Sequence, residues 1–322
     1  MMPALLSPET GALSCPPAEA SAHAWMPHSP CGASCVDAPA EAGTLRVAAR
    51  LAGVAGVLLS FPLAHLATPR RRRAALQRRY ARALLACCGI RVRVLDNRGA
   101  EERVEGGLLV VARHVGWTDI VALTAVEPMG FVARADLIDW PMLGEVARKA
   151  RVIPIERERL RALPEVIATM VARVRAGERV AFYPEGTTWC GRAHGTLRPA
   201  LFQAAIDAQV PVQPLRLRYL DRNGELSTVP GFVGTDSLTD SIRRVLRSKG
   251  VVAEIALQPL EYPTVDRFDL ARRCERALEG DTVARAFTDV IHGSENVEAV
   301  GTGAVRHVEV TGTHHADVAQ RV

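Results

Sequence analysis

Between residues 90 and 279, short apolar runs alternate with longer helix-like segments. This alternation is typical of parallel sheets, because two parallel strands need a long crossover connection and a helix usually supplies it. The order therefore predicts an α/β sandwich around a mostly parallel sheet. The expected strands are Ile90–Leu95, Leu108–Ala112, Gly130–Ala133, Arg151–Ile155, Arg179–Tyr183, Val212–Tyr219 and Val251–Leu257, and the expected helices cover residues 118–127, 141–149, 158–176, 196–209, 237–247 and 266–279.

The chain is long enough, at 322 residues, for one large α/β domain with further segments at both ends. Residues 1–43 are rich in Ala, Pro, Ser and Gly, and we expect them to form a disordered tail. They lack the basic start and the early apolar core of a signal peptide. Residues 286–322 show no periodicity, and we expect a loose C-terminal tail there.

An apolar stretch begins at Leu45, and its uninterrupted part from Leu51 to Ala67 contains 17 residues. A helix that crosses a bilayer needs ~20 residues, so this run is at the short limit. A buried core helix is one interpretation. A helix that lies in or dips into a membrane fits better, because seven arginines follow at once and attract lipid phosphates; they are Arg70, Arg71, Arg72, Arg73, Arg78, Arg79 and Arg82.

The arginines also indicate an orientation, because positive residues flank membrane helices on the cytoplasmic side. Residues 74–90 are expected to form an amphipathic helix, so that residues 44–90 together make a membrane-associated helical segment. We therefore expect an anionic membrane surface as a partner and the cytoplasmic face of the cell membrane as the location. A nucleic-acid partner is not expected, since Tyr80 is the only aromatic residue among the arginines and such binders interleave aromatics or carry a known module.

The seven cysteines have an odd count and irregular spacing, which predicts no disulfide framework and a reducing compartment. Cys31 and Cys35 lie near His23 and His28 and could be taken for metal ligands. Ligand-type spacing without a surrounding fold is common by chance, so the sequence predicts no metal site.

The first stretch with catalytic residue types is Arg113–Asp119, which directly follows a strand-like run. If Trp117 opens a helix, Asp119 falls in its first turn and can turn back toward one ring nitrogen of His114. The carboxylate would then fix the tautomer and stabilise the imidazolium, while the other nitrogen takes a proton from a hydroxyl. The alternative is an ordinary loop histidine followed by an aspartate that favours a helix N-terminus.

A second stretch, Pro184–Thr188, follows another strand-like run about seventy residues later. Glu185 offers an acceptor, Gly186 permits close backbone approach, and Thr187 and Thr188 offer hydroxyls. The alternative is a simple turn with a solvated acid. Loops at the carboxyl ends of parallel strands meet at one edge of the sheet, where α/β proteins place ligands, so the two stretches predict one active site.

Two further segments come in the same order. Val152–Arg157 is a strand that delivers Arg157 at its end, although a surface ion pair would explain that arginine equally. Val210–Leu215 begins a strand with two prolines, which cannot donate to a ladder.

Together the four segments resemble the phospholipid/glycerol acyltransferase family, which includes the lysophosphatidic acid acyltransferases. The first family motif, N-H-x-S-x-x-D, matches at His114 and Asp119, with Arg113 in place of Asn and Gly116 in place of Ser. The third, F-P-E-G-T-R, matches from Tyr183 onward except at its last position. The second matches loosely at Val152–Arg157 and the fourth, V-P-x-x-P, at Val210–Pro214. The resemblance covers roughly residues 45–260.

The resemblance implies a glycerol-3-phosphate acyltransferase-like domain over residues 91–285, with His114 as general base and Asp119 as its orienter. The acyl donor would be acyl-CoA or acyl-carrier protein, with no cofactor, and the acceptor would be the hydroxyl of a lysophospholipid. The implied substrate-binding residues are Arg157, Glu185, Gly186, Thr187 and Thr188, with Arg192 and Arg198 supplying the charge that an arginine at position 188 would carry.

The leading acceptor is 1-acylglycerol-3-phosphate, which would give phosphatidic acid. Lyso-ornithine lipid or another lysophospholipid is the alternative, because family members with Glu-Gly-Thr-Thr act on such acceptors. An inactive, membrane-docked binding protein of acyltransferase-like fold is an alternative of another class. A serine lipase is disfavoured, because the sequence contains no G-x-S-x-G elbow.

Overall fold

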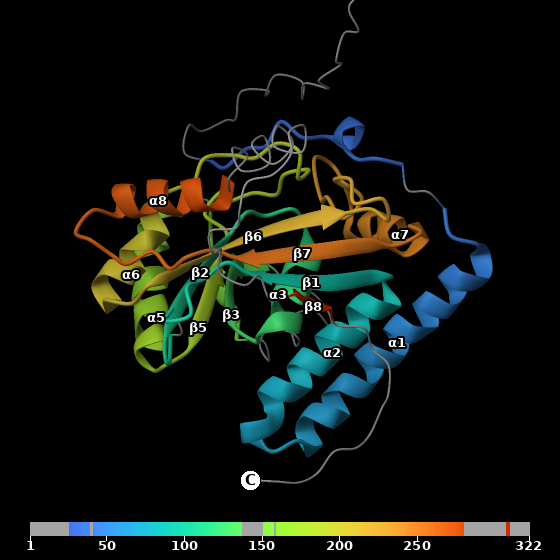
Figure 1. Cartoon of the computed structure of the whole chain (residues 1–322), viewed down its shortest axis with the longest axis horizontal. Coiled ribbons are helices and arrows are strands. Elements are labelled where there is room, and N and C mark those ends of the chain that lie inside the picture. Colours follow the sequence, from blue (N-terminus) through green and yellow to red (C-terminus); the bar gives the residue numbers. More distant parts are fainter. Residues whose placement is uncertain are drawn as a thin grey trace, which may run out of the picture.

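A computed structural model describes residues 26–38, 41–102, 104–136, 151–157 and 159–279, together with the backbone of 307–309. Its centre is an eight-stranded sheet with helices on both faces (Figure 1). The strand order is β4-β3-β5-β2-β6-β7-β1-β8. The strands are β1 (Ile90–Asp96), β2 (Leu108–Ala112), β3 (Gly130–Arg134), β4 (Ile153–Ile155), β5 (Arg179–Phe182), β6 (Val212–Leu220), β7 (Val251–Leu257) and β8 (His307–Glu309).

The sheet is mostly parallel, as predicted. β4, β3, β5, β2 and β6 run in one direction. β7 is antiparallel to β6, and β1 is parallel to β7, so these two strands run against the rest. All seven expected strands are present, although β4 starts later than expected because Arg151 has a left-handed φ of 56° that extended structure cannot include.

The helices also follow the predicted order. They are α1 (Thr44–Ala67), α2 (Arg73–Cys87), α3 (Trp117–Val126), α5 (Leu163–Arg175), α6 (Gln203–Ala208), α7 (Leu238–Arg247) and α8 (Arg267–Glu279). The helix expected at 141–149 lies outside the described residues. α5 begins later than expected, after a 3-10 turn and with a proline in its first turn, which is where proline favours a helix start. α6 is short because a 3-10 turn at Ala200–Phe202 precedes it.

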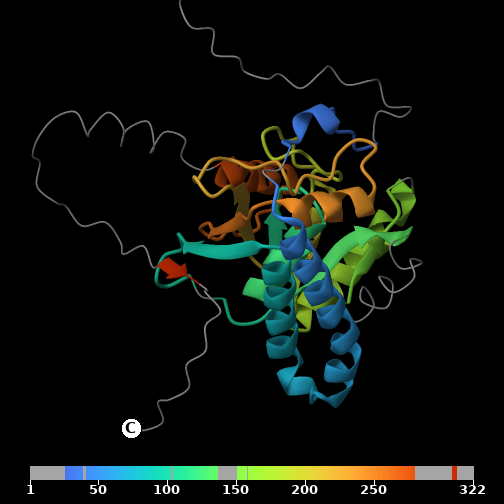
Figure 2. The same ribbon diagram turned by 90° about the vertical axis from the view of Figure 1, so that its right-hand side faces the viewer.

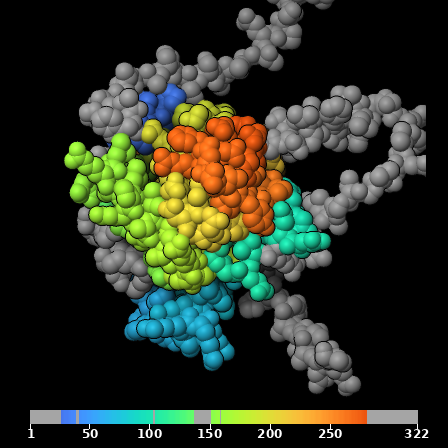
Figure 3. Space-filling view, turned by 90° about the vertical axis from the view of Figure 1, so that its left-hand side faces the viewer, coloured from blue at the N-terminus to red at the C-terminus, as the bar shows by residue number. Residues whose placement is uncertain are grey.

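Two apolar cores lie on opposite faces of the sheet. Leu108, Val110 and Ala112 of β2 pack toward α2, α3 and α7, whereas Leu109 and Val111 pack toward α5, α6 and α8. Figure 3 shows the second face, where α8 (orange) lies beside α6 and α5. Strands covered on both sides read as continuous apolar runs, which is why β2 was recognisable in the sequence.

α1 and α2 form an antiparallel hairpin that projects from the domain (Figures 1 and 2). α1 is the one described helix that is long and apolar enough to cross a membrane, with a mean hydropathy of 1.8. None of its residues is buried, and Leu63 and Leu66 are 72% and 80% exposed. The buried-core interpretation of this run is therefore wrong.

Residues 26–38, which we call the N-terminal strap, lie within the tail expected to be disordered but pack against the domain. Asp37 accepts hydrogen bonds from the hydroxyl of Thr228 and from Arg192, both at 2.9 Å. Cys31 packs in a small apolar cluster with Cys190 and Val233. Long-range contacts thus order a segment whose own composition predicts disorder.

In the expected C-terminal tail, the structure describes only β8. This strand pairs antiparallel with β1, with Val94 opposite Val308.

Candidate active site

The two catalytic-type stretches follow neighbouring parallel strands. β2 and β5 pair with Val111 opposite Phe182, so residues 113–116 (the first loop) and residues 183–199 (the second loop) emerge side by side. Both leave the carboxyl edge of the sheet, which is the edge predicted for the site.

The first loop and the start of α3 hold a histidine–carboxylate pair. His114 Nδ1 lies 2.8 Å from Asp119 Oδ2, and Asp119 is fully buried. The same oxygen accepts the backbone N–H of Val115 at 2.7 Å and of Gly116 at 3.0 Å. The geometry expected from the sequence, an aspartate of the first helical turn reaching back to the histidine, is confirmed.

A tyrosine from β6 completes the environment of this carboxylate. Tyr219 donates its hydroxyl to Asp119 Oδ1 at 2.7 Å. Burial and the charge of Asp119 raise the pKa of Tyr219 well above its usual value, so the phenol stays a donor. With Nδ1–H of His114 donated to Asp119, the other ring nitrogen, Nε2, carries the lone pair that can accept a proton.

Glu185 joins the two loops. This buried carboxylate accepts the backbone N–H of His114 and of Gly195, both at 2.9 Å, and the guanidinium of Arg113 at 3.1 Å. Burial raises the pKa of Glu185, while the two backbone donors and Arg113 oppose that shift. The arginine that stands where the family motif has Asn is thus the counter-charge of a buried acid and ties the first loop to the second.

The second loop also fixes His114 from two other sides. The rings of His114 and Tyr183 stack at 4.1 Å between centroids with an interplanar angle of 13°. The backbone N–H of Trp189 donates to the carbonyl of His114 at 2.8 Å. Both the ring and the peptide of His114 are therefore held before any substrate arrives.

A third loop, residues 221–237 between β6 and α7, closes against the first. Phe232 donates its N–H to the carbonyl of Val115 at 2.9 Å. A Cβ added at Gly116 would lie 2.5 Å from the carbonyl oxygen of Pro230, so only glycine fits at this position. The close approach of the third loop accounts for glycine where the family motif has serine.

The residues expected to bind substrate lie near His114, but they differ in burial and in hydrogen bonding. Thr188 donates its hydroxyl to the carbonyl of Phe232. Gly186 has a left-handed φ of 73°, and a Cβ there would lie 2.6 Å from Pro27 of the N-terminal strap. Thr187, next to it, is half-buried.

The three arginines expected to bind the substrate phosphate also differ in their contacts and positions. Arg192 forms an ion pair with Asp37 at 2.9 Å. Arg198 donates its backbone N–H to Pro184, and its side chain passes close to Gly186. Arg157 follows β4, which lies two strands beyond β5 at the same edge of the sheet.

Sequence reasoning missed several residues that shape the site. Tyr183 and Arg113 lie inside the two catalytic-type stretches, so their positions alone could have drawn attention to them. Trp189 and Gly195 follow closely after Pro184–Thr188. Tyr219 is 100 positions from the aspartate it contacts. The one usable signal for Tyr219 was its position near the carboxyl end of a predicted parallel strand.

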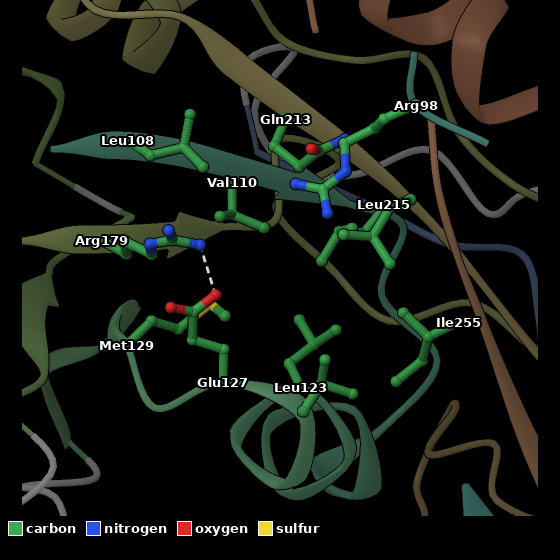
Figure 4. A pocket seen from close by; sticks show the side chains of 12 residues that line it. Arg98, Leu108, Val110, Leu123, Glu127, Met129, Arg179, Gln213, Leu215 and Ile255 are labelled. Atoms are coloured by element: carbon green, nitrogen blue, oxygen red, sulfur yellow. Dashed lines mark hydrogen bonds and ion pairs between the residues drawn. The ribbon is translucent and has the colours of Figure 1, made fainter. Parts of the chain in front are cut away.

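A small cavity of about 30 Å³ lies elsewhere, between the sheet and α3 (Figure 4). Leu108 and Arg179, at the amino ends of β2 and β5, line it, and Arg179 pairs there with Glu127. It has room for about one water molecule and lies at the opposite end of these strands from His114. The catalytic-type residues therefore do not belong to it.

Comparisons with known proteins show similarity to acyltransferases. Residues 90–218 match the profile of a protein family described as Acyltransferase. The chain is 34% identical over 214 residues to the lyso-ornithine lipid O-acyltransferase of Pseudomonas aeruginosa, covering 66% of this chain and 79% of that protein. It is 35% identical over 208 residues to the 1-acyl-sn-glycerol-3-phosphate acyltransferase of Neisseria meningitidis, covering 62% and 80%.

The fold is similar to the crystal structure of the 1-acyl-sn-glycerophosphate acyltransferase of Thermotoga maritima. The TM-score is 0.54 at 15% sequence identity, and the match covers 79% of this chain and 97% of that one.

Proposed function

Because the chain belongs to the acyltransferase family, we propose that it moves a fatty acyl chain from a thioester donor to the free hydroxyl of a lysolipid, with His114 as general base. The observation that carries the proposal is the hydrogen bond between His114 and the fully buried Asp119. It lies at the carboxyl ends of the parallel strands β2 and β5. It leaves Nε2 of His114 as the proton acceptor.

The reaction follows from that arrangement. Nε2 of His114 takes the proton of the acceptor hydroxyl as its oxygen attacks the thioester carbonyl carbon. The buried charge of Asp119 stabilises the imidazolium that forms. When the tetrahedral intermediate collapses, the C–S bond breaks and the imidazolium returns its proton to the sulfur, so the products are an ester and a free thiol. Acyl-CoA and acyl-carrier protein both supply such a thioester.

The leading acceptor is 1-acylglycerol-3-phosphate, the substrate named for the Neisseria relative. Arg157 and Arg198 are the cationic residues at this edge that would face its phosphate. Arg192 is a weaker candidate than the sequence implied, because Asp37 already neutralises its charge. Glu185 organises the loops and does not contact the phosphate, since its carboxylate is buried among three donors.

Lyso-ornithine lipid is a second candidate acceptor, supported by Thr188. The hydroxyl of Thr188 donates to the backbone carbonyl of Phe232, so position 188 offers a phosphate neither a charge nor a free hydroxyl proton. The Pseudomonas relative is named for lyso-ornithine lipid.

The protein would bind the cytoplasmic face of the cell membrane, and the exposed hairpin of α1 and α2 supports binding at a membrane surface. The start of α1 is tied to the domain, since Arg50 donates to the carbonyls of Leu246 and Ser248, and α2 leads back into β1. Both ends of the hairpin are therefore on the domain side. The exposed leucines of α1 would enter one leaflet, and the arginines from Arg70 to Arg82 would contact lipid phosphates.

Acyl transfer by the purified full chain tests the proposal. Long-chain acyl-CoA and acyl-carrier protein are each offered with 1-acylglycerol-3-phosphate and with lyso-ornithine lipid. His114→Ala is compared with His28→Ala, which removes an exposed histidine. We expect transfer that His114→Ala abolishes and His28→Ala retains.

The other outcomes are equally informative. Transfer to lyso-ornithine lipid alone would replace the leading acceptor by the second. Turnover that survives in His114→Ala would remove His114 as the base, and no transfer from either donor would overturn the proposed reaction.

A further inference from the structure

Three cysteines that the proposed reaction does not use meet beside the second loop. The sulfur atoms of Cys31, Cys35 and Cys190 all lie within 4.8 Å of one another. Cys31 and Cys190 are buried and Cys35 is half-buried. Among the described residues this is the only group of three or more potential metal-ligating side chains with such mutual distances.

The local structure presents the first two sulfurs as a pair. Cys35 is the last residue of the 3-10 turn Ala33–Cys35, and Cys31 lies two residues before the turn begins. The N–H of Cys35 closes the turn by donating to the carbonyl of Gly32 at 3.0 Å. Their spacing, C-x3-C, is within the range of zinc-ligand pairs. The third sulfur, that of Cys190, comes from the second loop, two residues after Pro184–Thr188.

The distances suit a tetrahedral thiolate site. Zinc–sulfur bonds of ~2.3 Å in a tetrahedron place the sulfurs roughly 3.8 Å apart. An upper limit of 4.8 Å between the three sulfurs therefore requires only a small inward movement when an ion binds. Soft thiolate ligands select zinc and similar cations over magnesium or calcium.

We propose that Cys31, Cys35 and Cys190 bind one divalent cation of the zinc class, with a water molecule in the fourth position, and that the ion fastens the N-terminal strap to the second loop. Three thiols become three thiolates on binding, and their three protons go to solvent.

A metal accounts for the cluster better than a disulfide does. A disulfide would join two of the sulfurs and leave the third without a role, whereas all three converge on one point. The N–H of Cys31 donates to the hydroxyl of Ser29 at 3.3 Å, which holds the backbone of Cys31 beside the turn.

The ion would connect the strap with the catalytic histidine. Cys190 directly follows Trp189, whose N–H holds the carbonyl of His114. On the other side of the second loop, Pro27 of the strap lies against Gly186. A cation at the cysteines therefore restrains the loop that holds His114 from a position outside the reacting groups.

Metal analysis of the purified full chain tests the site without any activity measurement. Protein prepared under reducing conditions and given zinc, with the excess removed, is measured by elemental analysis. We expect about one zinc per chain, and a loss of it in Cys31→Ser, Cys35→Ser and Cys190→Ser. Cys87→Ala, on α2, is the matched cysteine control and should retain the metal.

Cobalt loading supplies a second readout. Replacement of zinc by Co²⁺ should give the visible absorption and thiolate-to-metal charge-transfer bands of a tetrahedral sulfur site, and these bands should weaken in Cys31→Ser. This variant changes only the strap, so it keeps the test decisive if Cys190→Ser fails to fold.

Three results would overturn the proposal. These are a zinc-free chain with three free thiols, a disulfide between Cys31 and Cys190 in peptide mapping, and zinc that persists in all three serine variants. The outcome is independent of the proposed acyl transfer, since neither the metal content nor the cobalt spectrum depends on a substrate.

Discussion

Replacing Asp119 by asparagine isolates the negative charge beside His114, the proposed general base. Oδ2 of Asp119 accepts three hydrogen bonds, from His114, Val115 and Gly116, and Oδ1 accepts one from Tyr219. An asparagine that keeps its oxygen at the Oδ2 position retains the three bonds. Its amide then faces the Tyr219 hydroxyl, which can rotate to accept. The change thus removes a charge and leaves the number of hydrogen bonds unchanged.

The magnitude follows from the electrostatics of the pair. Two unit charges ~4 Å apart interact by ~4 kcal/mol at an effective dielectric constant of ~20. This interaction exists only once the imidazolium has formed, so it lowers the barrier without helping the acceptor to bind. At 1.36 kcal/mol per factor of ten, the expected loss in kcat is ~10³-fold, inside the ~10²–10⁴ range of acid–base groups.

Initial rates with 1-acylglycerol-3-phosphate and acyl-CoA measure this loss. KM for the acceptor should change little, because Asp119 is fully buried and out of reach of a substrate. Tyr219→Phe is the matched control, since it removes a hydrogen bond to the same carboxylate and keeps the charge. We expect a loss of ~1–3 kcal/mol in its stability from the unpaired oxygen, with a rate within about tenfold of the parent.

A folded Asp119→Asn variant with a rate within about tenfold of the parent would refute the reasoning. Asp119 would then be a helix N-terminal residue that only positions the first loop. A loss equal to that of Tyr219→Phe would lead to the same conclusion, because it would show that the hydrogen bonds, and not the charge, determine the rate.

Three further outcomes follow from other parts of the structure. Arg113→Asn removes the cation that lowers the pKa of Glu185, so that pKa, already raised by burial, rises further. The variant's deficit in unfolding free energy should be small up to the ordinary glutamate range and grow as pH increases above it, because only the ionised carboxylate gains from Arg113. Urea titrations at several pH values measure the deficit, and one that shrinks as pH rises would contradict the pairing. Leu63→Asp with Leu66→Asp should weaken vesicle binding without lowering the melting temperature, since both side chains are largely exposed, and unchanged vesicle sedimentation would exclude the hairpin as the anchor. Asp37→Ala should speed proteolytic cleavage within residues 26–38, because it removes the ion pair and hydrogen bonds of the N-terminal strap, and an unchanged cleavage rate would show that other contacts hold it.

Most of the sheet could be predicted, because its information is local. A strand covered on both faces is a continuous apolar run, and β2 and β7 begin and end at the predicted residues. The histidine–aspartate pair is local as well, since its two members are five positions apart and a helix start brings them together. Some strand and helix ends differ from the predicted residues because of local backbone conformation. The left-handed φ of Arg151, for example, delays the start of β4.

The remainder of the site depends on tertiary contacts. The sequence predicted Glu185 as a residue of the site, with a solvated acid as the alternative, and only the pairing of β2 with β5 shows that Arg113 neutralises it. Tyr219 contacts Asp119 across 100 positions. No periodicity in either segment encodes such a pair, because strand order within a sheet determines which loop ends meet.

The N-terminal strap shows why composition alone misjudged one segment. A stretch rich in Ala, Pro, Ser and Gly buries too little apolar surface to order itself, and that inference is sound for an isolated chain. It fails when a folded domain offers specific partners, and here Asp37 reaches Thr228 across 191 positions. The cysteines follow the same logic. Cys31 and Cys35 alone make a spacing that chance often produces, and a ligand site becomes a physical hypothesis only when Cys190 is brought from the second loop to the same point. The proposed metal site joins the N-terminal strap to the second loop, so no rule that reads one segment at a time can detect it.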